Sequence, residues 1–236
     1  MNAKQKTVEV EYLVVGAGIA GLGAATYLHE QGKEVLVLES ERHPGGRMWT
    51  NSKGDTPYDI GAQFIDSSYK NIIRYSKRYG LQPVRVPIPR TGISDGHTTH
   101  MLATSSAGIL RFKGMKPRAR VGFLASAVKV VASRPHINSY NLKTGLPLDS
   151  ISAEKYFLER TNKQGVTELL SPIIHGLAFY SLKETSAAFL KAFIGKLLLL
   201  KPLTYSRGIG ELPATLAEKL DVIYGAKIMS IERQKD

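Results

Sequence analysis

Hydrophobic residues near the start of the chain follow a strand, helix and strand pattern. Val8 to Val15 ends in the apolar run Tyr-Leu-Val-Val and is predicted to form a buried strand. Leu22 to Gln31 is rich in alanine with apolar residues at helical spacing, and Gly32 stands where a glycine ends a helix. Glu34 to Glu39 predicts a second strand. This succession is the opening unit of a parallel, doubly wound α/β sheet.

The middle of the chain alternates helical and extended patterns with less regularity. Helices are predicted over Asn71 to Tyr79, over Ala119 to Ala132, and from the N-cap residue Ser152 to about Thr161. Short strands and turns are predicted over Thr91 to Lys113.

The last part of the chain carries further helix signals. Ser181-Leu182-Lys183-Glu184 fits a capping box ahead of a helix that ends near Pro202. Leu212-Pro213 places a proline in the first turn of a helix to Leu220. Val222 to Ile231 predicts strands.

The composition is that of a chain able to bury a core. Its 236 residues allow one large domain or two small ones, and 43% of them are apolar. The absence of cysteine excludes disulfides, thiolate metal ligands and a cysteinyl-linked cofactor. Residues 1–11 are polar, and no run reaches the roughly 18 apolar residues of a membrane span. We therefore expect a soluble, cytoplasmic protein.

Basic residues concentrate in one internal segment. The formal net charge is +12, and residues 67–148 hold 14 lysines and arginines against a single acid, Asp95. Such a field suggests an anionic small-molecule substrate, an acidic protein or a lipid surface, with a solvated basic face as the alternative. No nucleic-acid-binding motif accompanies the charge, so nucleic acid is disfavoured. Lys191, Lys196 and Lys201 are predicted to lie on a solvated helix face, with peripheral membrane contact as the alternative.

Gly16, Gly18 and Gly21 form a G-x-G-x-x-G motif between the first predicted strand and helix. In that context the first glycine makes a tight turn, the second lets a pyrophosphate approach the backbone, and the third lets helix and strand pack closely. Glu39 lies 23 residues beyond Gly16, close to the roughly 20 expected for an acid that accepts hydrogen bonds from ribose hydroxyls. Its carboxylate also repels a 2′-phosphate, which argues against NADP. The motif predicts a dinucleotide site.

Two further turns favour FAD over NAD. Gly45-Gly46-Arg47 puts a guanidinium on a flexible turn, and the loop from Asp59 to Phe64 offers small residues against which a flat ring system can lie. Together these motifs resemble those of the flavin-containing amine oxidase superfamily, which includes protoporphyrinogen oxidase, phytoene desaturase-like and renalase-like enzymes. A further match is Gly208-Ile209-Gly210-Glu211-Leu212, followed by a helix and strands ending at Ile231.

The resemblance implies an α/β fold, a Rossmann-like FAD-binding parallel sheet with an inserted α+β substrate-domain portion. It implies an oxidoreductase that oxidises an amine or other C–H substrate by hydride transfer to FAD. The FAD is expected to be held noncovalently, because the chain has no cysteine and no motif for histidyl attachment. The implied cofactor-binding residues are Gly16, Gly18, Ala20, Gly21, Glu39, Gly45, Gly46, Arg47, Gly61, Ala62, Gln63, Phe64 and Ile228. In this assignment the glycine motif and the Gly-Gly-Arg turn meet phosphates, the Gly-Ala loop lies beside the isoalloxazine, and the backbone at Ile228 contacts the adenine.

The same resemblance divides the chain into segments. Residues 1–66 hold the FAD-binding motifs, residues 67–203 form a basic substrate-side insertion, and residues 204–236 return to the FAD-binding domain. The Gly-Asp motif that completes the family's flavin pocket has no counterpart in this chain, nor do the aromatic residues and the lysine that act at the flavin. We therefore expect a second polypeptide to supply them in a heteromer, with a truncated product as the alternative.

No side chain has the context of a catalytic acid or base, so the catalytic residues stay unassigned. His97 and His100 are predicted to lie on a surface strand or turn, and no metal site is predicted. Two other functions stay open. One is an NAD-dependent dehydrogenase, and the other is a non-catalytic nucleotide-binding subunit that binds FAD or ADP without turnover.

Overall fold

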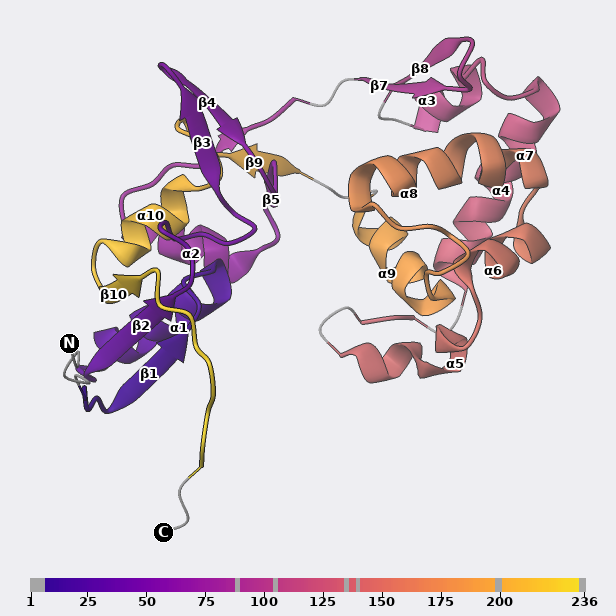
Figure 1. The fold of residues 1–236 in the computed structure, drawn as a ribbon. Coiled ribbons are helices and arrows are strands. Elements are labelled where there is room, and N and C mark those ends of the chain that lie inside the picture. The colour runs from indigo at the N-terminus through magenta and orange to yellow at the C-terminus, as the bar shows by residue number, and fades with distance from the viewer. Residues whose placement is uncertain are drawn as a thin grey trace. The chain divides into compact units, whose positions relative to one another are not determined.

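The computed structural model describes residues 7–87, 90–103, 106–133, 136–138, 141–197 and 201–233. The chain forms two compact units, each with its own hydrophobic core: unit 1 is Met1–Val86 with Lys201–Asp236, and unit 2 is Pro87–Leu200 (Figure 1). These limits differ from the predicted segment limits at 66/67 and 203/204. At the first limit the difference arises because helix α2 (Lys70–Arg78) packs apolar side chains into the core of unit 1. At the second it arises because residues 202–204 form a strand that pairs within unit 1.

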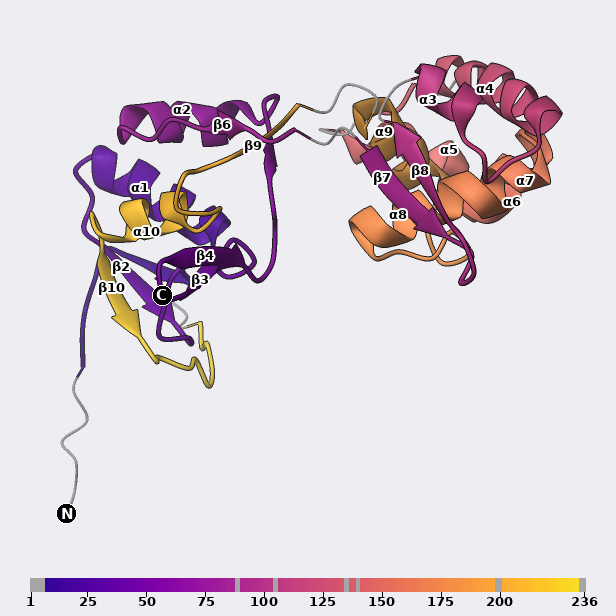
Figure 2. The same cartoon turned by 90° about the horizontal axis from the view of Figure 1, so that it is seen from above.

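Unit 1 is built on a parallel sheet with the strand order β1-β2-β10. The strands are β1 (Tyr12–Val15), β2 (Val35–Glu39) and β10 (Asp221–Tyr224), and the helices are α1 (Ile19–Glu30), α2 and α10 (Glu211–Ala217). The helices lie on one side of the sheet (Figure 2). This arrangement confirms the predicted strand, helix and strand unit and the α/β fold class.

The opposite face of this sheet is apolar and lacks a cover among the described residues. Val35 and Val37 of β2 point into the core and are buried. The exposed side chains are Leu13 (52%), Val15 (53%) and Ile223 (47%), which the strand register places on the other face. The prediction of a buried strand over Val8 to Val15 is therefore wrong: β1 begins at Tyr12 and lies exposed at the sheet edge.

The predicted strands over Val222 to Ile231 form only in part. β10 ends at Tyr224, and residues 226–231 contain no strand. Their backbone leaves the sheet beside the end of β2, where the Ala226 N–H donates to the carbonyl of Glu39 at 2.8 Å. Because this segment has no strand partner among the described residues, Met229 and Ile231 are 84% and 83% exposed.

Two small antiparallel sheets complete unit 1. They are the hairpin of β3 (Thr50–Lys53) and β4 (Thr56–Asp59), and the sheet of β5 (Ile65–Asp66), β9 (Pro202–Thr204) and β6 (Val84–Arg85). The Asp66 carboxylate accepts hydrogen bonds from the N–H groups of Lys201 at 2.8 Å and Ser68 at 2.9 Å. Burial acts to raise the pKa of Asp66, but these hydrogen bonds outweigh it and lower the pKa. The charged carboxylate thus fastens β9 to β5.

Unit 2 combines a β-hairpin with helices around a second core (Figure 1). Its elements are β7 (Arg90–Ser94), β8 (Thr99–Ala103), α3 (Ser106–Arg111), α4 (Pro117–Ala132), the short helix η1 (Leu142–Gly145), α5 (Leu146–Asp149), α6 (Ala153–Arg160), α7 (Lys163–Gly165), the π-helix η2 (Val166–Leu170), α8 (Ser171–Ala178) and α9 (Ala187–Leu197). Phe112, Phe157, Ile174 and Leu190 are fully buried at its centre. The mixture matches the predicted α+β insertion.

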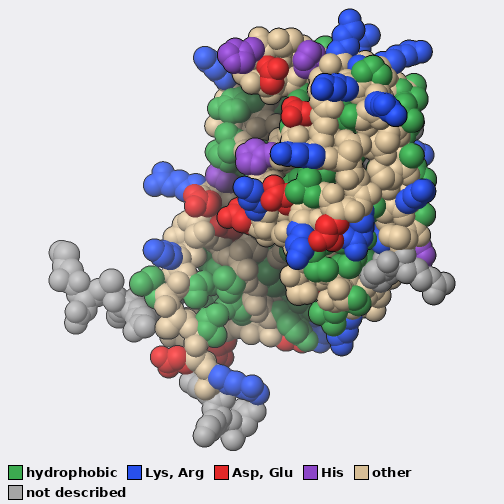
Figure 3. All heavy atoms as spheres, turned by 90° about the vertical axis from the view of Figure 1, so that its right-hand side faces the viewer, with side chains coloured by type: hydrophobic (Ala, Val, Ile, Leu, Met, Phe, Trp, Pro, Cys, Tyr) green, Lys and Arg blue, Asp and Glu red, His purple; other side chains and the backbone are tan. Residues whose placement is uncertain are grey.

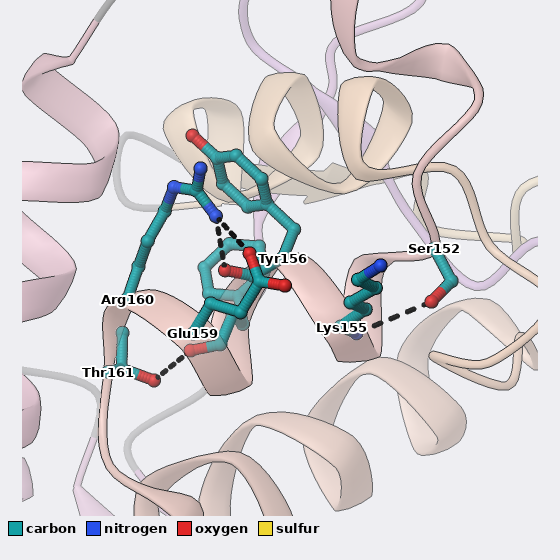
Figure 4. Close-up of polar contacts among 7 residues, drawn as sticks. Ser152, Lys155, Tyr156, Glu159, Arg160 and Thr161 are labelled. Carbon is teal, nitrogen blue, oxygen red and sulfur yellow. Dashed lines mark hydrogen bonds and ion pairs between the residues drawn. The ribbon is translucent and has the colours of Figure 1, made fainter.

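Helix α6 follows its local capping chemistry. The Ser152 hydroxyl accepts a hydrogen bond from the Lys155 N–H at 3.3 Å, which confirms Ser152 as the N-cap (Figure 4). At the other end, the guanidinium of Arg160 lies 4.0 Å from the centroid of the Tyr156 ring (Figure 4). The predicted helix over Ala119 to Ala132 is confirmed as α4.

Two local predictions in unit 2 are wrong. Residues 106–111 form α3, so the strands predicted over Thr91 to Lys113 end at Ala103. The capping box at Ser181 does not form either, because α9 begins at Ala187 and the hydroxyl of Ser186 accepts a hydrogen bond from the Ala188 N–H at 3.1 Å. The serine that adjoins the helix reaches its free N–H groups, whereas Ser181 is too far away.

Lys191 is buried, which contradicts the predicted solvated face. It is 5% exposed, and its Nζ donates to the carbonyl and to the hydroxyl of Ser133, the C-cap residue of α4. Burial, followed by the charge of Arg160, lowers the pKa of Lys191. Lys201 is exposed, and the side chain of Lys196 lies outside the described part of the structure.

Candidate functional site

The glycine motif makes a tight turn between β1 and α1. Gly16 has φ +95°, which favours glycine, and its N–H donates to the Leu38 carbonyl at 2.7 Å. A Cβ on Gly21 would stand 2.0 Å from the carbonyl oxygen of Gly16. Only glycine at 21 therefore allows α1 to pack this closely on the turn.

Open space lies in front of the first turn of α1. A Cβ on Gly16 or Gly18 would meet nothing within 4 Å. Gly18 is the N-cap and makes no side-chain cap, and the first hydrogen bond within the helix runs from the Leu22 N–H to the Gly18 carbonyl at 2.9 Å. The amides of Ile19, Ala20 and Gly21 therefore precede the first intrahelical bond, and no acid lies in this turn. We call the open space at Gly16 and Gly18, with the amides of residues 19–21, the cradle. It suits an anionic group.

Glu39 ends β2 against the glycine turn. Its Oε2 accepts a hydrogen bond from the Ala17 N–H at 2.6 Å, and its Oε1 accepts from the Glu41 N–H at 2.9 Å and from the Ser40 hydroxyl at 3.0 Å. Burial acts to raise the pKa of Glu39, but these hydrogen bonds outweigh it and hold the pKa below the usual range. Glu39 is thus an ionised acceptor beside the cradle.

The turn at Gly45-Gly46-Arg47 lies directly against the glycine motif. The Gly45 N–H donates to the Ala17 carbonyl at 2.8 Å, and Gly45 forms an isolated parallel bridge with Gly18. Gly45 and Gly46 have φ +109° and +52°, and a Cβ on Gly45 would stand 2.3 Å from the carbonyl oxygen of Met48. This geometry explains both glycines, and the Arg47 side chain that follows them is exposed.

The loop that contains Gly61 and Ala62 is attached to the same turn. The Ala62 N–H donates to the Arg47 carbonyl at 2.8 Å, and a Cβ on Gly61 would stand 2.1 Å from that oxygen. Gln63 is exposed and Phe64 is half-buried. The structure therefore brings the first three motifs together around the N-terminus of α1.

The Gly208-Ile209-Gly210 turn is held by two side chains that were not among the predicted site residues. The Ile209 N–H donates to Oδ1 of Asp59 at 3.0 Å, the Gly210 N–H donates to Oγ1 of Thr50 at 2.8 Å, and the Thr50 hydroxyl donates to Asp59 at 2.5 Å. Asp59 was recognisable as the acid that opens the Gly-Ala loop. Thr50 carried no signal, because its role depends on a contact 160 residues away.

Ile228 does not lie on a strand, although strands were predicted there. It is half-buried, two residues beyond the hydrogen bond from Ala226 to the carbonyl of Glu39. The backbone two residues before Ile228 therefore lies at the end of β2, next to Glu39.

An aromatic pair lies beside the Gly-Gly-Arg turn. The rings of His43 and Trp49 are stacked with centroids 3.8 Å apart and an interplanar angle of 7°. Trp49 is the single tryptophan of the chain. Within the described residues no group of three or more His, Asp or Glu side chains is arranged to hold a metal ion.

The family model for flavin-containing amine oxidoreductases matches residues 19–236, so the chain belongs to this family. Over 80 residues it is 39% identical to flavin-containing amine oxidase A of Sus scrofa, a match covering 34% of this chain and 15% of that protein. Among solved structures, cyclohexylamine oxidase from Brevibacterium oxydans has 20% identity and a TM-score of 0.68 over 92% of this chain and 51% of its own. A fatty acid isomerase from P. acnes has 16% identity and a TM-score of 0.62 over 94% and 52%.

The match to the family model confirms the predicted family and its flavin cofactor. At such low identity the solved structures show a shared fold, and the chain spans about half of their length. The matched part of the porcine amine oxidase is smaller still, at 15% of that protein.

Proposed function

We propose that this chain is the FAD-binding part of an FAD-dependent oxidoreductase that oxidises an amine or another C–H substrate. The observation that carries the proposal is the convergence of the predicted motifs at one place, from Gly16 through Glu39, Gly45 and Gly61, around an open helix N-terminus. A bound FAD would supply the redox chemistry, that of a two-electron hydride acceptor, and the residues of this chain would hold and orient it.

The residues present fit the cofactor. The free space at Gly18 and the amides of the first turn of α1 suit a pyrophosphate. The ionised Glu39 suits ribose hydroxyls and repels a 2′-phosphate. Arg47 adds a cation beside the phosphates, and the small residues Gly61 and Ala62 leave room for the flat ring system. The Gly-Ala loop of residues 59–64 and the Gly-Gly-Arg turn favour FAD over NAD.

A titration of the full chain with FAD tests the site. FAD is expected to quench the fluorescence of Trp49, which lies beside the Gly-Gly-Arg turn. The variant Gly18→Val should abolish quenching and still fold, because Gly18 has φ −71° and its Cβ meets no neighbour. The control variant Gly23→Ala, also in open space, should bind normally. Equal FAD binding by all three proteins would refute the assignment.

We also propose that a second polypeptide covers the bare face of the β1-β2-β10 sheet. This polypeptide corresponds to the part of the solved relatives that the present chain does not match. The support is the exposed row of Leu13, Val15 and Ile223, since parallel sheets normally have both faces covered. Purification from the native source should yield such a polypeptide bound to the chain. The double variant Leu13→Glu/Ile223→Glu should lose it, and Leu146→Glu, exposed in unit 2, should keep it. Retention by the double variant would contradict the proposal.

Turnover separates this function from the non-catalytic alternative. With the native complex loaded with FAD, anaerobic addition of simple aliphatic and aromatic amines should bleach the flavin absorbance band with at least one of them. Stable FAD or ADP binding without bleaching would favour a nucleotide-binding subunit. An absorbance change that depends on a nicotinamide would favour the dehydrogenase.

A further inference from the structure

Helix α4 presents an apolar stripe to solvent. Phe123 and Val130 point into the core of unit 2 and are 5% and 3% exposed. Val121 and Val128 lie on the other side of the helix and are 60% and 61% exposed. Their spacing of seven residues keeps both valines on one stripe. A surface helix normally carries polar residues at such positions, so this stripe indicates contact with something apolar.

Exposed cations lie on the same helix, on α3 and in the turn between the two helices. The exposed cations on α3, on α4 and in the turn between them are Arg111, Lys113, Lys116, Arg118 and Lys129. None of them forms an ion pair with another described residue. Residues 96–148 contain no aspartate or glutamate that could neutralise them. In Figure 3 lysine and arginine side chains gather at the upper right, over this part of unit 2.

Arg120 joins the two helices into one surface. Its Nε donates to the Met115 carbonyl at 2.8 Å and its Nη1 to the Leu110 carbonyl at 3.0 Å, across the turn between α3 and α4. Leu110, 44% exposed, is thereby held near the start of α4. We call Leu110, Val121 and Val128 with the five cations the α3–α4 face.

We propose that the α3–α4 face binds the surface of a membrane that contains anionic phospholipids. The cations attract phosphate and carboxylate headgroups, and the three aliphatic side chains enter the boundary between headgroups and acyl chains. Lysine and arginine suit this position because their apolar stems lie along the acyl boundary while their charges reach the headgroups. The described part of the chain contains no helix with the length and hydropathy of a membrane span.

The composition of the face favours a membrane over an acidic protein. Three of the five cations are lysines, a residue type that is depleted at protein–protein interfaces. The apolar members are single aliphatic side chains with no aromatic anchor, whereas binding energy in protein interfaces concentrates in buried aromatic residues and arginines. A fluid lipid surface accepts such scattered side chains without a matching pocket.

Co-sedimentation of the full chain with vesicles tests the proposal. Binding is expected with phosphatidylcholine vesicles that contain phosphatidylserine, to be weak with phosphatidylcholine alone, and to fall as salt rises. Arg118→Gln/Lys129→Gln should lower the partition coefficient about 25-fold, because each cation at an anionic surface contributes about fivefold. Val121→Ser/Val128→Ser should also lower it and leave the salt dependence unchanged. These four side chains are exposed, so thermal unfolding should match the wild type.

A matched control separates the face from net charge. Lys53→Gln/Lys219→Gln removes the same charge from exposed positions in unit 1 and should bind vesicles as the wild type does. An equal loss in this control would overturn the proposal. The absence of binding to the phosphatidylserine vesicles would also overturn the proposal. Binding to an acidic polypeptide such as polyglutamate in place of these vesicles would favour an acidic protein as the partner.

Discussion

The backbone N–H of Ala17 donates a 2.6 Å hydrogen bond to Oε2 of Glu39. The acid at the end of β2 therefore lies against the middle of the glycine turn that follows β1, although 22 residues separate the two. This contact depends on the parallel pairing of β1 and β2, in which Val15 stands beside Leu38. It places an ionised acceptor and an open helix N-terminus next to each other, as a dinucleotide requires.

Replacing Glu39 by glutamine should weaken FAD binding by about tenfold or more, because a hydrogen bond to a charged group contributes about 1.5–3 kcal/mol. Calorimetric titration measures the change. Glu34→Gln alters an exposed carboxylate just before the same strand and should leave the affinity unchanged. Equal affinity for FAD in both variants would show that Glu39 does not meet the cofactor.

Glu39 should also make the stability of the chain depend on pH in the acid range. Its folded-state pKa lies below that of the unfolded chain, so its contribution is fully present above the unfolded pKa and is lost as the pH falls through the folded pKa. Thermal unfolding of the wild type and of Glu39→Gln should therefore differ at neutral pH and converge below about pH 4. A constant difference across this range would mean that Glu39 keeps its charge or acts by packing alone.

Two glycines in α1 should respond oppositely to alanine. Gly21→Ala should lower the free energy of unfolding by about 1–3 kcal/mol, because its Cβ would stand 2.0 Å from the carbonyl oxygen of Gly16. Gly23→Ala should raise it by about 0.5–1 kcal/mol, because the site is open and alanine favours a helix. Urea denaturation gives both values, and the same sign for both would contradict the close packing of turn and helix.

The burial of Lys191 should make stability rise with pH in the alkaline range. Its pKa is lowered in the fold, so between the folded and unfolded pKa values the unfolded chain binds more protons and stability increases with pH. Lys191→Met removes the titrating group and should abolish this rise, whereas Lys201→Met, at an exposed lysine, should retain it. Unfolding curves at several alkaline pH values measure the slope, and an unchanged slope in Lys191→Met would assign the effect to another group.

The sequence shows that residues 96–148 contain basic residues and no aspartate or glutamate. It does not show which side chains of this segment are exposed. A helical spacing over Ala119 to Ala132 predicts α4 correctly, yet both of its faces contain apolar residues. Which face is buried depends on packing against other helices of unit 2, and that packing puts Phe123 inside and Val121 outside. The same reason explains the error at Lys191, whose burial depends on Ser133 at the end of another helix.

Features that depend on neighbouring residues could be predicted from the amino-acid sequence. The β1-α1-β2 unit, the positive φ at Gly16 and Gly32, and the Ser152 cap follow from local sterics and hydrogen bonding, and the glycine motifs follow from what a phosphate needs. Three features became visible in the folded chain alone: β10 pairs with β2, Thr50 and Asp59 hold the Gly208–Gly210 turn, and Leu13 stays exposed. These contacts join residues far apart in the sequence, and their pairing depends on shape and burial across the whole unit, which local patterns do not encode.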